Sequence, residues 1–247
     1  MTQSPKPWVV AQYLATALFS LKPASSTSSG GKSLLVPTPF ALKMALLDAA
    51  IRTEGQQVGK ARFKTIRDLQ IAIYLPEKAV VNNTFIKILR PHKAGPKDVN
   101  GTGLLTPMGN TIAFREYVNF GEAMSLAFQG MPTAQLAPLL LQINYLGKRG
   151  GFMQLQGEPT AYDWSTNDLR TNGYTLLTEP MTEFSVNGLL QMLDDCGPKM
   201  TFDHANIYSG KAIKLGRERI LRHIVLPYRL VRSSKGYSYY ERIDEGE

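Results

Sequence analysis

The sequence predicts an α+β protein, because segments that alternate like half-buried strands enclose segments with helical periodicity. Residues 8–21 alternate apolar and polar side chains, as at Val10, Gln12 and Leu14. Residues 39–52 instead place apolar side chains three or four positions apart. With 247 residues, of which 43% are hydrophobic, the chain can bury a sizeable core in one large domain or two small ones.

The first half of the chain predicts strands on both sides of one helix. Residues 8–21 fit a half-buried strand, and a Ser/Gly loop leads to a short apolar strand at 34–36. Thr38 and Pro39 then open a helix, because Thr is a good N-cap and Pro is favoured at the first helical position. Its apolar stripe comprises Phe40, Met44, Leu47 and Ile51. Two strands, 69–75 and 84–90, flank a turn region.

The second half predicts further strands and a second helix. Residues 91–111 are polar and glycine-rich, and too long for an ordinary connection. A strand, a turn and a strand follow over 112–130, and then a helix over 133–146 that Pro138 weakens. Residues 151–157 fit a strand, and 223–231 and 236–243 fit a closing pair of strands. Over 8–157 this order is that of a split βαβ, or ferredoxin-like, arrangement, which commonly presents an open sheet to RNA.

Several classes of site are excluded by the residues present. The triplet Gly31-Lys32-Ser33 is not a P-loop, because that motif needs glycine where the chain has Ser26, and because Pro37 disfavours helical geometry in the residue before it. The single Cys196 excludes an internal disulfide framework and suits a reducing cytoplasm. Three scattered histidines show no metal-ligand spacing, and no apolar run approaches a membrane span. We therefore expect a cytoplasmic protein with no metal, no cofactor and no membrane contact.

Charge is distributed unevenly along the chain, whose net charge is +8. Residues 60–97 carry nine Lys/Arg against two acids, and residues 211–235 carry eight against one. Between them, residues 158–203 hold eight acids and two basic residues. Two basic blocks around an acidic one indicate an electrostatic footprint for nucleic acid, and the alternative is two solvated faces.

Two short segments have the residues for a phosphate or base contact. Lys148 and Arg149 stand between glycines that let backbone approach a phosphate, although the same pattern also fits a helix C-cap with dipole-matched cations. Arg115 and Tyr117 share strand parity and so face the same side, where they can pair with phosphate and stack on a base. An ordinary surface strand is the alternative.

The C-terminal basic series is also a candidate. A helix there would have a basic face for backbone phosphates, and contact with a partner subunit is equally compatible; the series is Lys211, Lys214, Arg217, Arg219 and Arg222. Asp194, Asp195 and Cys196 form no catalytic set, since no histidine or lysine lies beside them in sequence. We expect His204 and His223 to be structural.

Three segments in order resemble a known family: SLLVPTPFALKMALLDAAI at 33–51, FREYVNF at 114–120 and INYLGKRGGFMQL at 143–155. Their order is similar to that of the CRISPR-associated RAMP superfamily, specifically the Cas-five-type subunit of type I Cascade surveillance complexes. The resemblance covers roughly residues 8–157. It implies a ferredoxin-like domain over 1–157 with a thumb hairpin inserted at about 76–113, and a smaller β-containing C-terminal region over 158–247.

The resemblance also implies partners. Such proteins bind the 5′ handle of a CRISPR RNA (crRNA), cap a filament of backbone RAMP subunits and contact the large subunit, with target DNA as a further candidate contact. The RNA-binding candidates here are Lys32, Lys43, Arg90, His92, Lys93, Lys97, Arg115, Tyr117, Lys148, Arg149, Lys211 and Lys214.

Two other functions stay open at this point. Some members of the family cut precursor RNA with a metal-independent Tyr/Lys/His set, which His92 and Lys93 could supply with Tyr74 or Tyr117. A His-Lys pair in a basic thumb is more simply an RNA contact or a solvated tip. The other alternative is a repeating backbone RAMP subunit that binds spacer RNA along a filament.

Overall fold

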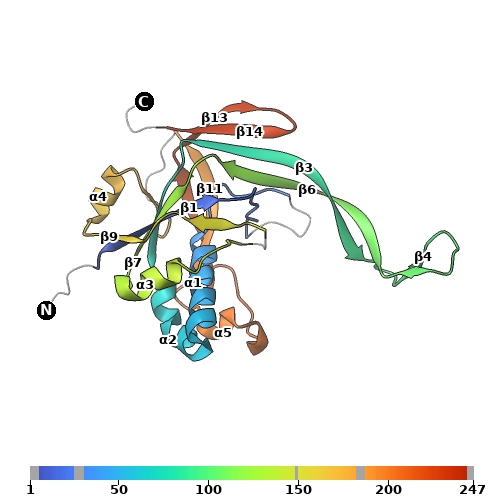
Figure 1. The fold of residues 1–247 in the computed structure, drawn as a ribbon, viewed down its shortest axis with the longest axis horizontal. Coiled ribbons are helices and arrows are strands. Elements are labelled where there is room, and N and C mark those ends of the chain that lie inside the picture. Colours follow the sequence, from blue (N-terminus) through green and yellow to red (C-terminus); the bar gives the residue numbers. More distant parts are fainter. Residues whose placement is uncertain (1–5, 25–30, 148–149, 182–186, 244–247) are drawn as a thin grey trace.

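The structure, a computed structural model, describes residues 6–24, 31–147, 150–181 and 187–243 (Figure 1). Its central sheet is antiparallel throughout, with the order β10-β2-β7-β1-β8 and β9 paired to β1. The strands are β1 (Trp8–Ala15), β2 (Gln70–Tyr74), β7 (Met124–Gln129), β8 (Met153–Leu155), β9 (Thr160–Tyr162) and β10 (Thr175–Leu176). The protein is thus a mixed α and β fold with antiparallel sheets, as the sequence predicts.

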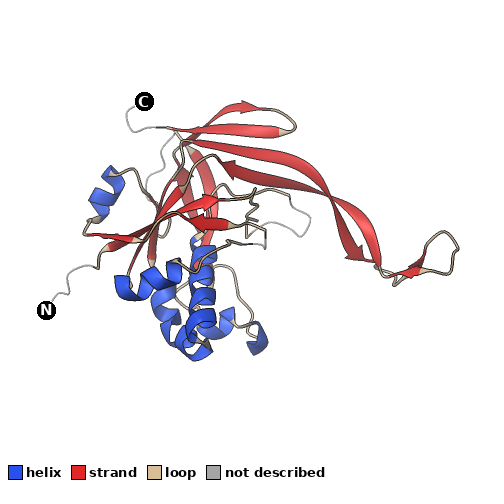
Figure 2. Cartoon of the chain, in the orientation of Figure 1, coloured by secondary structure: helices blue, strands red, loops and turns tan. Residues whose placement is uncertain are grey.

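Helices gather on one side of this sheet (Figure 2). They are α1 (Pro39–Glu54), α2 (Gln56–Arg67) and α3 (Thr133–Leu140). The predicted start of α1 is confirmed, because the Thr38 side chain accepts a hydrogen bond from the Ala41 N–H and Pro39 follows it. The predicted apolar stripe is only partly right: Leu42 and Leu46 are fully buried, whereas Phe40 and Met44 are half-buried. Helix α1 is enclosed on more than one side, so a single stripe does not describe it.

The other face of the central sheet is covered as well. Trp8, Val10, Ala72 and Ala127 point into a second apolar cluster, which is closed by Leu169 and Leu176 with Trp164 and Tyr174 at its border. Leu169 belongs to the short helix α4 (Thr166–Thr171), whose N-terminus has a capping box between Ser165 and Asp168. The expectation of an open sheet face for RNA is therefore wrong, because apolar clusters lie on both faces of the central sheet.

A long hairpin projects from the body (Figure 1). Its arms, β3 (Lys78–Pro91) and β6 (Met108–Phe120), pair in unbroken register from Ala79↔Phe120 to Pro91↔Met108. The pair β4 (Lys97–Asp98) and β5 (Leu105–Thr106) lies at its far end. The sequence prediction started the first arm too late, at residue 84, because the polar residues Asn82 and Asn83 looked like a turn, yet they pair within the sheet.

The C-terminal part completes two further sheets. The predicted closing pair is confirmed in its second member, β14 (Tyr237–Arg242), but the predicted strand 223–231 is divided at Pro227 between β12 (Arg219–Leu226) and β13 (Tyr228–Ser233). Strand β14 pairs with β13 and adds to β3, which gives the order β13-β14-β3-β6. Strand β11 (Leu189–Cys196) pairs with β12 (Arg219–Leu226) and packs on α1. Two short helices, α5 (Phe202–Ala205) and η1 (Ile207–Ser209), connect them.

Three other predicted elements differ from the structure. Residues 34–36 form an isolated bridge, Leu21↔Leu34, instead of a strand. The helix predicted to Leu146 ends at Leu140, two residues after Pro138, whose ring removes a backbone donor. The series from Lys211 to Arg222 forms a loop and the start of β12, not a helix. Within the described residues, no helix is both long and apolar enough to cross a bilayer.

Candidate nucleic-acid interface

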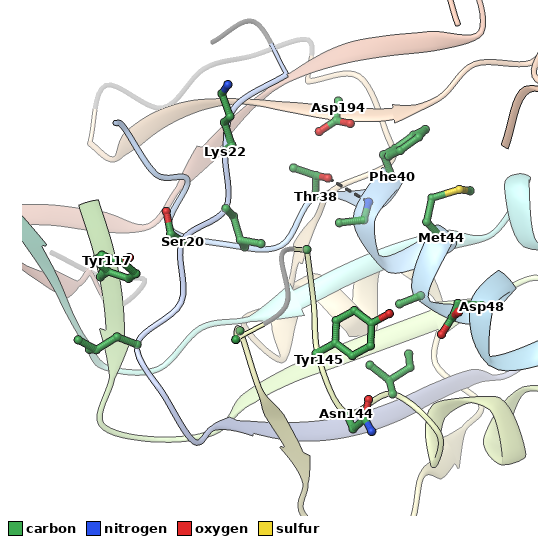
Figure 3. Close-up of a pocket in the computed structure, with 18 of the residues that line it drawn as sticks. Ser20, Lys22, Thr38, Phe40, Met44, Asp48, Tyr117, Asn144, Tyr145 and Asp194 are labelled. Carbon is green, nitrogen blue, oxygen red and sulfur yellow. Dashed lines mark hydrogen bonds between the residues drawn. The ribbon is translucent and has the colours of Figure 1, made fainter. Parts of the chain in front are cut away.

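One pocket of about 640 Å³ brings together the three sequence segments that carry the resemblance (Figure 3). The first wall is the start of α1, the second is β6, and the third is the chain after α3. The lining residues from these segments are Thr38, Phe40, Ala41, Met44, Ala45, Asp48, Arg115, Tyr117, Ile143, Asn144, Tyr145, Gly147, Gly150 and Gly151. Segments more than 100 residues apart in the chain therefore share one cavity.

The α1 wall is tied to the C-terminal strands. The Arg219 guanidinium lies 4.2 Å from the centroid of the Phe40 ring, a cation–π arrangement. Arg219 Nε also lies 2.6 Å from Oδ2 of Asp194, whose side chain is buried. These three side chains line the pocket together. A cation in the wall is thereby held in a fixed orientation by an aromatic face and a carboxylate.

Farther along α1, Arg52 joins the helix to the chain after α3. Its Nε donates to Asp48 Oδ2 at 2.8 Å, and its Nη2 donates to the Gln142 carbonyl at 2.9 Å. Both Asp48 and Arg52 line the pocket. This bridge orders the wall that leads into residues 147–151, which we call the glycine loop.

Backbone hydrogen bonds join the chain on the two sides of the glycine loop. Leu146 N–H donates to the Gly151 carbonyl at 3.0 Å, and Met153 N–H donates to the Asn144 carbonyl at 2.9 Å. Gly147 and Gly150 have φ values of 71° and 105°. Residues with a side chain rarely adopt such backbone conformations, so glycine is required at both. Lys148 and Arg149 lie outside the described residues, but the glycines on either side of them line the pocket.

The β6 wall contributes Arg115 and Tyr117, which face the same side as their strand parity predicts. Leu18 and Ser20 lie beside them in the lining. Among the described residues, the lining has four cationic side chains, Lys22, Arg52, Arg115 and Arg219, against the two carboxylates Asp48 and Asp194. The pocket therefore combines positive charge with aromatic rings, as an RNA-binding site requires.

Two lysines from the sequence prediction have carboxylate partners. Lys32 is exposed, and its Nζ lies 2.6 Å from Glu116 Oε1, while the Ser33 N–H donates to the other carboxylate oxygen. Lys32 stays a predicted RNA contact, because its side chain is exposed. Lys43 is different: its ammonium is buried 2.6 Å from Asp195 Oδ1. A buried, paired lysine cannot reach a surface ligand, so we leave Lys43 out of the interface.

The hairpin residues Arg90, His92, Lys93 and Lys97 lie far from the pocket. Arg90, Lys93 and Lys97 are exposed, and the His92 ring packs against Gly109 of the other arm. From Lys78 to His92 the extended chain spans roughly 45 Å. Tyr74 lies at the base, where its ring contacts Tyr174 and the Arg242 guanidinium. The structure thus does not bring Tyr74 to His92 and Lys93, and Tyr117 is also distant along β6.

The remaining candidates lie on the loop before β12. Lys211 Nζ lies 2.8 Å from Asp203 Oδ2, and this contact lowers the pKa of the Asp203 carboxyl. Lys214 is exposed. Neither lysine lines the pocket. No group of three or more His, Cys, Asp or Glu side chains in the described parts of the chain is arranged to hold a metal ion.

Sequence reasoning missed two cationic residues of the pocket lining, Lys22 and Arg52, and did not connect a third, Arg219, with the pocket. Lys22 lies in the Ser/Gly loop, Arg52 in the last turn of α1, and Arg219 opens β12. Arg219 belonged to the basic C-terminal series, but only the fold shows that it turns toward the pocket and not toward solvent with its neighbours. Contacts between residues far apart in the chain cannot be predicted from the spacing of neighbouring residues in the sequence.

Comparisons with known proteins agree with the family resemblance that the three segments carry. No protein-family model matches the chain. A CRISPR-associated protein Cas5 of Archaeoglobus fulgidus is 28% identical over 212 residues, which cover 83% of this chain and 86% of that protein.

Two solved structures resemble the fold. The crystal structure of a CRISPR protein from Archaeoglobus fulgidus has a TM-score of 0.45 at 13% identity, and it covers 97% of this chain and 93% of its own. A chain of a CRISPR RNA-guided surveillance complex has a TM-score of 0.44 at 15% identity, with 76% of each chain covered. The Cas5 similarity along most of both sequences confirms the resemblance to CRISPR-associated RAMP proteins of the Cas5 type.

Proposed function

We propose that this chain is a crRNA-binding subunit of a type I CRISPR surveillance complex and that it holds the 5′ handle of the RNA in the pocket between α1, β6 and the glycine loop. The observation that carries the proposal is the convergence of the three family-like segments on one cationic, aromatic cavity. Side chains from three separate parts of the chain can contact one ligand there. A common ligand accounts for all three.

The chemistry of the lining supports a nucleic acid backbone with unstacked bases. Arg115 and Arg219 supply charge for phosphates, and the half-buried rings of Tyr117 and Tyr145 supply stacking surfaces. Gly147 and Gly150 leave the backbone free of side chains on either side of the two cations that the sequence places at Lys148 and Arg149. Base recognition and charge neutralisation would therefore occur in the same cavity.

We further propose that the fold is ferredoxin-like. Strands β1 and β2 are both antiparallel to β7, which lies between them, so they run parallel to each other and are joined through α1. Strand β8 follows α3 and adds beside β1. This supports a split βαβ order for residues 1–157, with residues 158–247 as the C-terminal region.

The hairpin supports a second part of the proposal, contact with neighbouring subunits. Its free-standing part begins beyond Asn82, the last β3 residue opposite β14. It exposes large apolar side chains: Phe85, Leu89, Leu104, Leu105 and Ile112 are each at least 62% exposed. We propose that this hairpin is the thumb and that it docks on backbone subunits of the filament that the chain caps, while the large subunit binds elsewhere on the body.

Binding of an RNA that copurifies with the complex tests the function. We expect Lys148→Ala with Arg149→Ala, and separately Arg115→Ala, to weaken binding of that RNA. Each lost phosphate contact should reduce the slope of log affinity against log salt by about 0.7. The matched control is Lys60→Ala with Lys64→Ala, which removes two exposed cations from α2, outside the pocket. Wild-type affinity and slope in both pocket variants would overturn the proposal.

A further inference from the structure

A second surface with RNA-binding chemistry lies on the four-stranded sheet β13-β14-β3-β6. Along β14, Tyr237, Tyr239 and Glu241 have the same parity and face one side. The registered pairs Asn82↔Tyr117 and Tyr237↔Asn82 place Tyr117 in the same row as Tyr237. Three tyrosines from two strands therefore share one face of this sheet.

The other side of the sheet faces the core, which fixes the direction of the tyrosines. Ala79, Val81, Val118 and Phe120 are buried in the main core, and Tyr240 packs against it. These residues have the opposite parity from Tyr117, Tyr237 and Tyr239. The tyrosines must then point away from the core, and all three are half-buried, with part of each ring accessible.

Cationic side chains surround these rings. Lys78 pairs with Glu241 and Glu241 with Arg229, so all three lie in one row of the outward face. Across the bulge in β13, Arg232 lies opposite Tyr239. We call these six residues the tyrosine–arginine face: Tyr117, Tyr237, Tyr239, Lys78, Arg229 and Arg232.

Glu241 is the acidic residue in these rows, and its carboxylate is contacted by neighbours on the same face. Tyr239 Oη donates to Glu241 Oε1 at 2.8 Å, and Arg229 Nη2 lies 3.7 Å from Oε2. The carboxylate thereby holds the Tyr239 ring and the Arg229 side chain in place. The face keeps a positive balance, with three cations against one carboxylate.

The face continues into the pocket. Tyr117 belongs to both, and Arg115, two residues earlier on β6, lies in the pocket lining on the same side of the strand. An extended chain that leaves the pocket past Tyr117 would meet Tyr237 next, across Asn82, and then Tyr239 and Arg232. We propose that the tyrosine–arginine face binds single-stranded RNA that continues from the pocket, with bases on Tyr237 and Tyr239 and phosphates at Arg232 and Lys78.

The chemistry favours a single strand. In a duplex the bases already stack on one another, whereas a single strand can place its bases on aromatic rings. Stacking requires no particular base, so this face adds affinity without sequence selection, and the pocket keeps any sequence preference. The inference rests on the proposed function, because the path starts from RNA held in the pocket.

The test compares two labelled fragments of the RNA that copurifies with the complex, one of about 6 nucleotides that fills the pocket and one of about 16 that reaches the sheet. We expect wild type to bind the longer RNA at least tenfold more tightly. Tyr237→Ala with Tyr239→Ala should weaken binding of the longer RNA roughly tenfold or more and leave the shorter one unchanged. Arg232→Ala should lower the salt slope for the longer RNA by about 0.7.

Two control variants separate binding from folding. Tyr237→Phe with Tyr239→Phe keeps the rings and should bind the longer RNA within about twofold of wild type. Ser238→Ala, between the tyrosines but on the opposite side of β14, should have no effect. An equal loss of affinity for the longer RNA in the Phe and Ala variants would overturn the proposal that bases stack on these rings.

The outcomes distinguish the two proposals. If wild type binds both lengths equally, or if the double Ala variant binds the longer RNA like wild type, this inference fails and the pocket assignment stands. If neither RNA binds to wild type, the proposed function fails and this inference with it. Tighter binding of single-stranded DNA of the same sequence than of the longer RNA, lost in the same double Ala variant, would overturn the assignment to RNA.

Discussion

Lys43 and Asp195 form an ion pair inside the protein, with Nζ 2.6 Å from Oδ1 and side chains that are 3% and 1% exposed. Asp195 also accepts from Arg222 Nε at 2.9 Å and from the Cys196 N–H at 2.7 Å. Its carboxylate is therefore bonded on both oxygens. Because Lys43 is on α1 and Asp195 on β11, the pair fastens the C-terminal strands to the first helix.

Removing either charge should destabilise the fold strongly. We expect Lys43→Ala to lower the free energy of unfolding by about 3–5 kcal/mol, since it leaves the Asp195 carboxylate buried without its closest cation. Urea unfolding followed by circular dichroism measures this. Lys64→Ala, an exposed lysine on α2, should change the free energy by less than about 0.5 kcal/mol. Similar values for the two variants would contradict a structural role for the pair.

Gly197 should tolerate no side chain. A Cβ there would overlap the Arg217 backbone carbonyl, and backbone cannot move aside as a flexible side chain can. We expect Gly197→Ala to cost about 1–3 kcal/mol, measured as a lower melting temperature. Gly121 is the matched control, because a Cβ added there would meet nothing within 4 Å and its φ is not positive. Gly121→Ala should be neutral or stabilise slightly; equal melting temperatures for the two variants would count against the contact.

Burial raises the pKa of the Cys196 thiol to about 12, above the ordinary value of 9.0. The unfolded chain therefore loses this proton at lower pH than the folded chain. Stability from the protonated thiol is complete below about pH 9 and is lost as the pH rises toward 12, at up to about 1.4 kcal/mol per pH unit.

The comparison of pH 8 with pH 10 measures this loss. The decrease in unfolding free energy should be about 1.4 kcal/mol larger in wild type than in Cys196→Ala. Burial also raises the pKa of Tyr13 and Tyr228, and their shared contribution cancels between the two proteins. An identical decrease in both would show that the thiol ionises normally.

His92→Ala should not change any cleavage of repeat RNA without metal. General acid–base catalysis needs partners within hydrogen-bond reach, and Tyr74 lies at the opposite end of the hairpin. Incubation of repeat RNA with each protein in a chelator, followed by gel analysis, measures this. Cleavage by wild type that the substitution abolishes would restore the endoribonuclease alternative.

Local signals in the sequence predicted much of the fold. Thr38 and Pro39 mark the start of α1 because capping depends on neighbours within one turn. The last strand, predicted at 236–243, was predictable from its sequence pattern, whereas the predicted strand 223–231 runs across Pro227 and joins parts of two strands. The hairpin arms were underestimated, since Asn82 and Asn83 are poor strand formers, and partners on both neighbouring strands, Tyr117 and Glu116 on β6 and Tyr237 on β14, hold them in the sheet.

The site was predictable only in part. Arg115 and Tyr117 were found from strand parity, which is a local property, and they do line the pocket. Lys43 looked like a surface cation, because its partner Asp195 lies 152 positions away and no spacing connects them. The same holds for Arg219 beside Phe40. Contacts between distant segments require the fold.

The C-terminal residues have a consequence for how the chain can be divided. Strands β9 and β10 extend the central sheet on β1 and β2, and β14 pairs with β3 at the base of the hairpin. A cut near Gly157 would thus expose sheet edges and the Trp8 cluster in the N-terminal fragment. In the C-terminal fragment, β9, β10 and β14 would lose the strands with which they pair. Neither piece could therefore be grafted onto another protein as a self-sufficient module.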